Sequence, residues 1–167
     1  SATPRQSMSN QLENMNPCVI SISIVSHGQG ELVTQALADL ARMANPESFE
    51  VILTKNIPEQ LPFTTSDHPF PLRILQNEHP KGFGANHNAA FRQANGQFFC
   101  VMNPDIRIES DPFPALLDCL AETGAALVAP RVFSPKGSIE DSARHFPTPA
   151  NLLAKALGRK DGAYRLP

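Results

Sequence analysis

The chain has 167 residues, which suits one domain of ordinary size, and 41% of them are hydrophobic, enough for a sizeable core. Its 14 lysines and arginines against 16 acidic residues give a net charge of −2, which argues against nucleic acid as a partner. No apolar run approaches the ~20 residues of a membrane-spanning helix. We expect no signal peptide, because residues 1–16 lack an apolar run. The three cysteines have no C-x-x-C spacing, which favours packed, reduced thiols of a cytoplasmic protein over a metal or redox role.

Buried strand patterns alternate with helical patterns along the chain. Residues 1–17 have the composition of a disordered arm, and residues 56–71, with four prolines, form a long loop. We predict strands at 18–26, 49–54, 72–75, 97–102 and 125–129, and helices at 31–44, 85–94 and from 111 or 112 to 122. This alternation predicts an α/β fold with a largely parallel sheet and right-handed crossovers.

In such a fold, ligands lie outside the carboxyl ends of the strands, here at loops 26–30, 54–58, 77–84 and 103–107. The first loop has a G-x-G but no third glycine, and Lys55-Asn56 follow the second strand where an acidic residue would bind ribose. These departures argue against a dinucleotide site of the usual kind. Loop 26–30 is either a ligand loop or a plain strand-to-helix turn.

The loop after the third strand is rich in glycine. Gly82 and Gly84 let backbone amides approach a ligand, and they precede a helix N-terminus suited to a phosphate or sugar hydroxyl. The alternative is a capped turn in which Asn86 caps the helix and nothing binds.

Asn103-Pro104-Asp105 follow the fourth strand. A carboxylate at this place, next to a proline of fixed φ, is a rigid oxygen ligand for Mg²⁺ or Mn²⁺, which leave their other positions to water and phosphates. The alternative is a type I turn in which Asp105 is only a local cap.

Most of residues 18–150, and 72–149 element by element, resemble the donor half of family-two glycosyltransferases with the GT-A fold. The similarity is greatest to rhamnosyltransferase-like enzymes of bacterial surface polysaccharide synthesis. It lies in NEHPKGFGANHNAAFRQANGQFFCVMNPDIRIESD, in ALVAPRVFSPKGSIEDSARHFPTP and in the opening ISIVSHG. The resemblance implies a Rossmann-like three-layer sandwich with a mainly parallel central sheet, apparently truncated. Residues 18–150 would be the nucleotide-sugar-binding domain, and 151–167 a helix or tail that begins a missing acceptor half.

The resemblance also implies roles for individual residues. Asp105 would hold Mg²⁺ or Mn²⁺ on the diphosphate of a UDP-, dTDP- or GDP-sugar. The donor-binding positions would be Ser26, His27, Lys55, Lys81, Gly82, Gly84, Asn88, Asn103 and Arg131, the last bordering the sugar or acceptor. The implied reaction is inverting, metal-dependent transfer to a polysaccharide or lipid-linked acceptor, in the cytoplasm or at the inner face of the membrane.

Two departures from the family pattern keep other functions open. Lys55 stands where the family usually has an aspartate that contacts the base or ribose. The family's general base lies in a later Glu-Asp segment, and Glu140-Asp141 come too early to match it. We therefore expect donor binding with slow or no transfer, and an exposed apolar flank that favours self-association. The alternatives are an inactive nucleotide-sugar-binding module, a scaffold domain of a polysaccharide assembly system, or an unrelated Rossmann-like nucleotide enzyme.

Overall fold

The computed structural model describes residues 18–139, and these fall into two compact units that meet in sequence between Asp111 and Pro112. Each unit is described by itself. The predicted N-terminal arm, the C-terminal tail and the Glu140-Asp141 loop lie outside the described residues. None of the described helices is long and apolar enough to cross a membrane.

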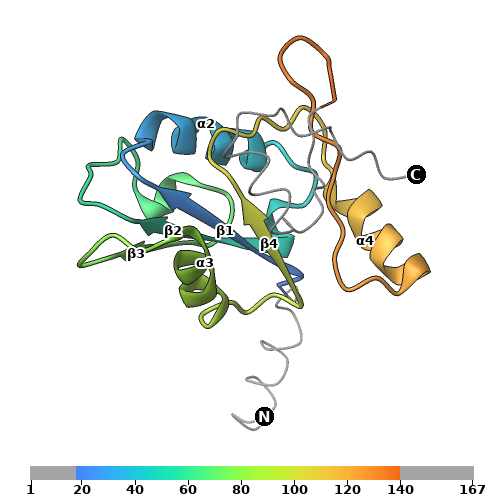
Figure 1. The fold of residues 1–167 in the computed structure, drawn as a ribbon, viewed down its shortest axis with the longest axis horizontal. Helices are drawn as coiled ribbons and strands as arrows, with labels where there is room; N and C mark the ends of the chain where they lie inside the picture. The colour runs from blue at the N-terminus through green and yellow to red at the C-terminus, as the bar shows by residue number, and fades with distance from the viewer. Residues whose placement is uncertain (1–17, 140–167) are drawn as a thin grey trace, which may run out of the picture. The chain divides into compact units, whose positions relative to one another are not determined.

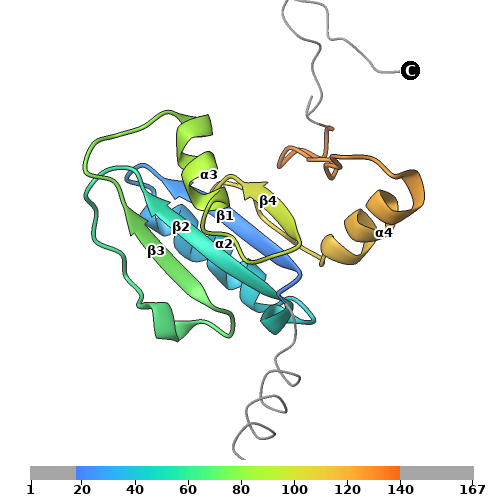
Figure 2. The same cartoon turned by 90° about the horizontal axis from the view of Figure 1, so that it is seen from below.

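The first unit contains a four-stranded sheet in which all neighbouring strands are parallel, in the order β3-β2-β1-β4 (Figures 1 and 2). The strands are β1 (Ile20–Ser26), β2 (Phe49–Lys55), β3 (Leu72–Gln76) and β4 (Phe98–Met102). The chain moves outward from β1 to β3 and then returns to place β4 on the other side of β1. The strand order therefore reverses between β1 and β4, which is where parallel α/β sheets bind ligands.

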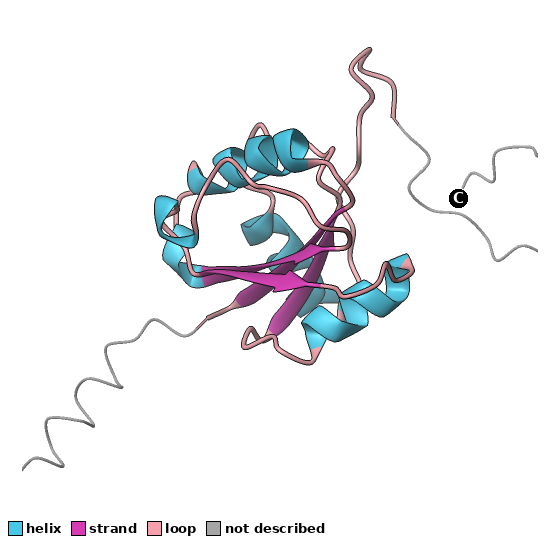
Figure 3. Cartoon of the chain, turned by 90° about the vertical axis from the view of Figure 1, so that its left-hand side faces the viewer, coloured by secondary structure: helices cyan, strands magenta, loops and turns pink. Residues whose placement is uncertain are grey.

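Helices α2 (Gly30–Ala41) and α3 (Phe83–Phe91) cover opposite faces of this sheet (Figures 1 and 3). In β1, isoleucines alternate with Ser21 and Ser23, so one face is apolar and the other is polar. The polar face receives α3, where Nδ1 of His87 lies 2.8 Å from Oγ of Ser23. Burial lowers the pKa of His87, which favours a neutral ring in this contact. The predicted helix–sheet–helix sandwich is confirmed.

The apolar face of the sheet carries most of the core. Ile22, Ile24 and Leu53 are fully buried there, together with Val33 and Leu37 of α2. Burying an aliphatic side chain of this size contributes about 1.5–3 kcal/mol, so this layer is a main source of stability. The spacing of these residues, two in the strands and three to four in the helix, is the pattern from which the elements were predicted.

A buried carboxylate joins the strands at the amino end of the sheet. Glu50 of β2 accepts hydrogen bonds from Oγ of Ser21 at 2.7 Å and from the backbone and side-chain nitrogens of Asn95 at 2.7 and 3.0 Å. Burial alone raises the pKa of Glu50, but these hydrogen bonds outweigh it and the pKa lies below its ordinary value. The amide of Gly96 donates to Ser21 Oγ at 2.8 Å, so the α3–β4 loop is held against β1.

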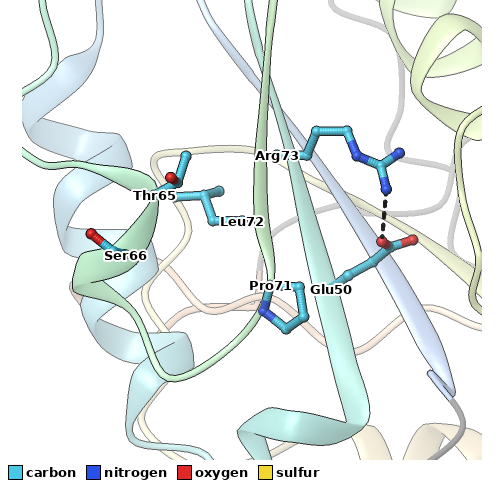
Figure 4. A pocket seen from close by; sticks show the side chains of 6 residues that line it. All are labelled: Glu50, Thr65, Ser66, Pro71, Leu72 and Arg73. Carbon is cyan, nitrogen blue, oxygen red and sulfur yellow. Dashed lines mark ion pairs between the residues drawn. The ribbon is translucent and has the colours of Figure 1, made fainter. Parts of the chain in front are cut away.

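A pocket of about 380 Å³ lies at the same amino end, as Figure 4 shows. The ion pair between Arg73 and Glu50, 3.5 Å long, forms part of its wall. The other lining residues are Thr65, Ser66, Pro71 and Leu72. Since ligands of parallel sheets bind at the carboxyl ends of the strands, this pocket is at the end opposite to the predicted site.

The second unit contains α4 (Phe113–Thr123), which ends at Gly124 with a φ of 64°. The predicted fifth strand at 125–129 is wrong, because the structure assigns no strand to these residues. A β-branched or apolar run forms a strand only where a neighbouring strand pairs with it, and Leu127 is 84% exposed. Residues 134–138 form a turn that closes an isolated antiparallel bridge between Phe133 and Ile139.

The three cysteines are unpaired and half-buried. Burial raises the pKa of the Cys100 thiol to about 11, so this side chain stays protonated at neutral pH. A protonated thiol is a poor metal ligand and a poor nucleophile, which agrees with the packing role predicted for it.

Candidate functional site

The four predicted ligand loops leave the sheet at the same edge. The parallel register places Ser26, Lys55 and Gln76 side by side at the ends of β1, β2 and β3. It also places Met102 beside Ile24, so β4 ends close to the same level. The loops after all four strands therefore begin at one edge of the sheet, with the reversal of strand order between β1 and β4.

Three buried asparagines, Asn56, Asn77 and Asn86, form a cluster behind this edge. Asn77 Nδ2 donates to Oδ1 of Asn56 at 2.9 Å and to Oδ1 of Asn86 at 2.7 Å. The backbone amide of Lys81 donates to Asn56 Oδ1 at 2.8 Å. The Lys81 carbonyl accepts from the side-chain amides of Asn56 and Asn86, both at 3.1 Å. The asparagine cluster therefore fixes the main chain of Lys81 through both its donor and its acceptor.

The same cluster reaches the loop after β1. The side-chain nitrogen of Asn56 lies 3.1 Å from Nδ1 of His27, whose ring is otherwise exposed. The backbone adds two further links, because Asn56 N donates to Ser26 O at 2.8 Å and Asn77 N donates to Lys55 O at 3.0 Å. Three loops far apart in sequence are thus joined by buried and partly buried hydrogen bonds.

The structure corrects the prediction for Asn86. The N-cap of α3 is Gly82, the helix begins at Phe83 rather than at residue 85, and the Asn86 side chain is fully buried in the asparagine cluster. Asn56 and Asn77 were not among the predicted site residues. Their signal was a polar residue directly after each of two strands, β2 and β3, where a side chain that turns inward needs hydrogen-bond partners.

The two predicted glycines lie in open space. A Cβ added at Gly82 or Gly84 would meet nothing within 4 Å, and neither residue has a positive φ. Backbone conformation therefore does not require glycine at either position, unlike at Gly28, whose φ is +76°. The open space leaves the main chain at the start of α3 accessible.

The Ser26 side chain stabilises the turn that follows β1. The Ser26 side chain is buried, and its Oγ accepts a hydrogen bond from Gln29 N at 3.2 Å at the start of α2. A groove of about 720 Å³ lies next to this turn, lined by residues 28–32 and 59–62. Glu59 Oε1 accepts a long hydrogen bond of 3.4 Å from the Gly28 amide, which joins the two sides of the groove.

Asp105 lies on the turn that follows β4. The amide of Ile106 donates to the Asn103 carbonyl at 3.3 Å, and Pro104 between them is buried. Asn103 and Asp105 are exposed, and no hydrogen bond or ion pair joins the Asp105 carboxylate to any residue between 18 and 139. The turn predicted as the alternative is present, but within these residues the carboxylate caps nothing.

The model of the family described as glycosyl transferase family 2 matches residues 21–163 of the chain. The chain belongs to this family. The solved structure of S. aureus TarS is 20% identical, with a TM-score of 0.51, and covers 64% of the chain. This likeness shows the fold, a GT-A, Rossmann-like α/β fold. The chain spans 20% of the length of TarS, and no curated protein matches it.

The residues at the carboxyl edge of the sheet in this family 2 chain fit a divalent cation that takes only some of its ligands from the protein. Among the described residues, no group of three or more His, Cys, Asp and Glu side chains converges on a point. A fully protein-made cage is therefore missing from residues 18–139. An exposed carboxylate that has no partner within residues 18–139 suits instead a Mg²⁺ or Mn²⁺ ion that takes its remaining ligands from phosphates and water.

Three of the other predicted donor-binding residues lie outside the asparagine cluster. Lys55 is half-buried at the end of β2, and Asn88 is exposed on α3. Arg131 is exposed in the second unit and follows no strand, contrary to the predicted position after a fifth strand. Arg131 therefore belongs to a different unit from the predicted donor loops.

Proposed function

We propose that this family 2 domain binds a nucleotide-sugar at the carboxyl edge of its sheet and contributes to transfer of the sugar to an acceptor. The observation that carries the proposal is the exposed Asp105 carboxylate, which has no partner among residues 18–139 and lies on the turn after β4, beside the point where the strand order reverses. Family membership over residues 21–163 supports the same class of reaction.

The described residues divide the work of binding the donor. Asp105 would hold a Mg²⁺ or Mn²⁺ ion, with Asn103 beside it, and the ion would neutralise charge on the leaving diphosphate. The accessible main chain at Gly82 and Gly84 begins α3, whose N-terminal amides attract a phosphate. Lys81 is exposed on the segment held by the asparagine cluster, so its ammonium group is available to the same anion.

The finer parts of the proposal rest on the sequence motifs. They are an inverting displacement, a UDP-, dTDP- or GDP-sugar donor, a polysaccharide or lipid-linked acceptor, and a location in the cytoplasm or at the inner face of the membrane. In an inverting displacement the acceptor oxygen bonds to the anomeric carbon as the bond to the diphosphate breaks, and a base takes the acceptor proton. We assign no described residue to that base.

Calorimetry of nucleotide binding with and without Mn²⁺ tests the role of Asp105. We expect Mn²⁺ to tighten the binding of UDP, dTDP or GDP, and we expect Asp105→Ala to remove that gain while leaving metal-free binding unchanged. Glu109→Ala is the matched control, because Glu109 is an exposed carboxylate a few residues further along the same loop. An equal Mn²⁺ gain in wild type and Asp105→Ala would contradict the proposal.

A second function, donor binding without transfer, is favoured by one residue. Lys55 at the end of β2 offers an ammonium group where the family usually has an aspartate. This change affects the nucleoside side of the site and leaves Asp105 in place. Nucleotide-sugar binding without turnover on simple sugar or lipid acceptors would favour this function over catalysis.

A further inference from the structure

The most buried charge in the first unit is a carboxylate on α2 rather than at the sheet edge. The Asp39 side chain is 1% exposed and accepts four hydrogen bonds. Arg107 donates two of them, from Nε at 2.7 Å and from an η-nitrogen at 3.0 Å, and the backbone amide of Ile108 donates a third at 3.0 Å. Arg42 donates the fourth at 2.6 Å.

These bonds attach the loop after β4 to α2. Arg107 and Ile108 come two and three residues after Asp105, and Met102 lies three residues before it in the sheet. Arg107 also donates to Gln35 Oε1 on α2 at 3.0 Å. The short turn that carries Asp105 is thus fixed on one side by β4 and on the other by Asp39.

Charge balance alone does not explain this arrangement. Arg42 already provides a cation to Asp39 from within the same helix. A second arginine, 68 residues away in sequence, and a backbone amide from the same segment also bind this carboxylate. They attach that segment to α2 rather than neutralise the charge of Asp39. The hydrogen bonds of Arg107 hold the pKa of Asp39 well below its ordinary value, so the carboxylate stays charged at neutral pH.

We propose that Asp39 and Arg107 are a pair of positioning residues that hold the turn 103–106 so that Asp105 faces the cation of the bound donor. This inference rests on the proposed function and names residues outside the site itself. Neither side chain touches the ion, and both act through the conformation of the turn. Residues that orient a metal ligand in this way typically change metal affinity by about 10–100-fold when they are replaced.

Two glutamine substitutions separate positioning from charge. Arg107→Gln removes the two-pronged contact to Asp39, whereas Arg42→Gln removes an ion pair to the same carboxylate and leaves the loop attached. Both arginines are more than half exposed, so both variants are expected to fold. The readout is the ratio of UDP, dTDP or GDP affinity with Mn²⁺ to that without it.

We expect Arg107→Gln to lower this Mn²⁺ ratio by about 10–100-fold or to abolish it, with metal-free binding unchanged. Arg42→Gln should keep the wild-type ratio, and Arg107→Lys should restore part of it through a single hydrogen bond. A metal-free measurement is independent of the donor: the Ile108 amide should exchange its hydrogen faster in Arg107→Gln than in Arg42→Gln.

The inference is overturned if Arg107→Gln keeps the wild-type ratio while Asp105→Ala removes it. It is also overturned if Arg42→Gln and Arg107→Gln lower the ratio equally, because the charge of Asp39 would then matter and the attachment would not. If wild type and Asp105→Ala show the same response to Mn²⁺, the proposed function fails at Asp105 itself, and the inference falls with it.

Discussion

Replacement of Asn77 tests whether the hydrogen bonds of the asparagine cluster stabilise the loops of the site. The side-chain nitrogen of Asn77 makes the two hydrogen bonds that join this residue to Asn56 and Asn86, at 2.9 and 2.7 Å. In Asn77→Ala both bonds are lost, at about 1 kcal/mol each, and the buried Oδ1 of Asn86 is left without a donor, at a further cost of about 1–3 kcal/mol. Asn56 Oδ1 keeps the Lys81 amide as a donor. The expected loss of stability is therefore about 3–5 kcal/mol.

Urea denaturation of the wild type, Asn77→Ala and Asn88→Ala measures this loss. Asn88 is the matched control, because it is an asparagine on α3 with an exposed side chain, and its replacement should change stability by less than about 0.5 kcal/mol. A loss of about 3–5 kcal/mol corresponds to a fall in Tm of about 6–20 °C for a protein of this size. Similar stabilities of the two variants, or a loss below about 1 kcal/mol in Asn77→Ala, would refute the reasoning.

Two further predictions concern the glycines and the pH dependence. A Cβ at Gly96 would lie 2.4 Å from the backbone nitrogen of Ser21, so Gly96→Ala should cost about 1–3 kcal/mol, whereas Gly84→Ala, in open space within α3, should be neutral or stabilising. Equal urea midpoints for these two variants would contradict the packing argument. The pKa of Asp39 is lowered from its ordinary 3.8, so its stabilisation is complete well above pH 3.8 and is lost as the pH falls further. The gap in unfolding free energy between wild type and Arg107→Gln should therefore narrow from pH 7 to pH 3, and a constant gap would show that Arg107 does not act on the Asp39 carboxylate.

The strands and helices of the first unit were predictable because each has a local periodic pattern. The segment rich in β-branched residues at 18–26 and the helical spacing of Val33, Leu37 and Leu40 require no knowledge of their neighbours. Short crossovers between such elements then favour a parallel sheet. The carboxyl edge of that sheet followed from the same reasoning, which is why the loops of the candidate site were found before the structure.

The strand predicted at 125–129 is wrong because its formation depends on more than a local pattern. Its sequence, AALVA, is compatible with a strand, but a strand needs a hydrogen-bonding neighbour, and the pattern of one segment does not provide that information. The predicted start of α3, at residue 85, is two residues too late, because the N-cap Gly82 has no side chain from which a cap could be recognised. Boundaries set by backbone geometry are less visible in a sequence than boundaries set by side chains.

The contacts that build the site were the least predictable. Asn56, Asn77 and Asn86 each have an ordinary explanation alone, as a loop residue or a cap, and their function depends on meeting in space. Asp39 and Arg107 are 68 residues apart, and each lies in a segment whose polar residues suit a solvated surface. Interactions of this kind become visible only when the fold brings the partners together.

The glycine-rich loop and the Asp105 turn differ in the chemistry that holds them. Neutral amides fix Lys81, and their hydrogen bonds do not change with protonation between acid and neutral pH. An ion pair fixes the segment after Asp105, and it weakens when Asp39 is protonated. A diphosphate held between these segments would bring negative charge to Asp105, which already bears the same sign. A cation between them removes that repulsion, and it does so only if the Asp105 turn keeps its place. The turn is therefore the part of the edge where a rigid attachment matters most for the donor, and it is the part that the most buried carboxylate of the first unit holds.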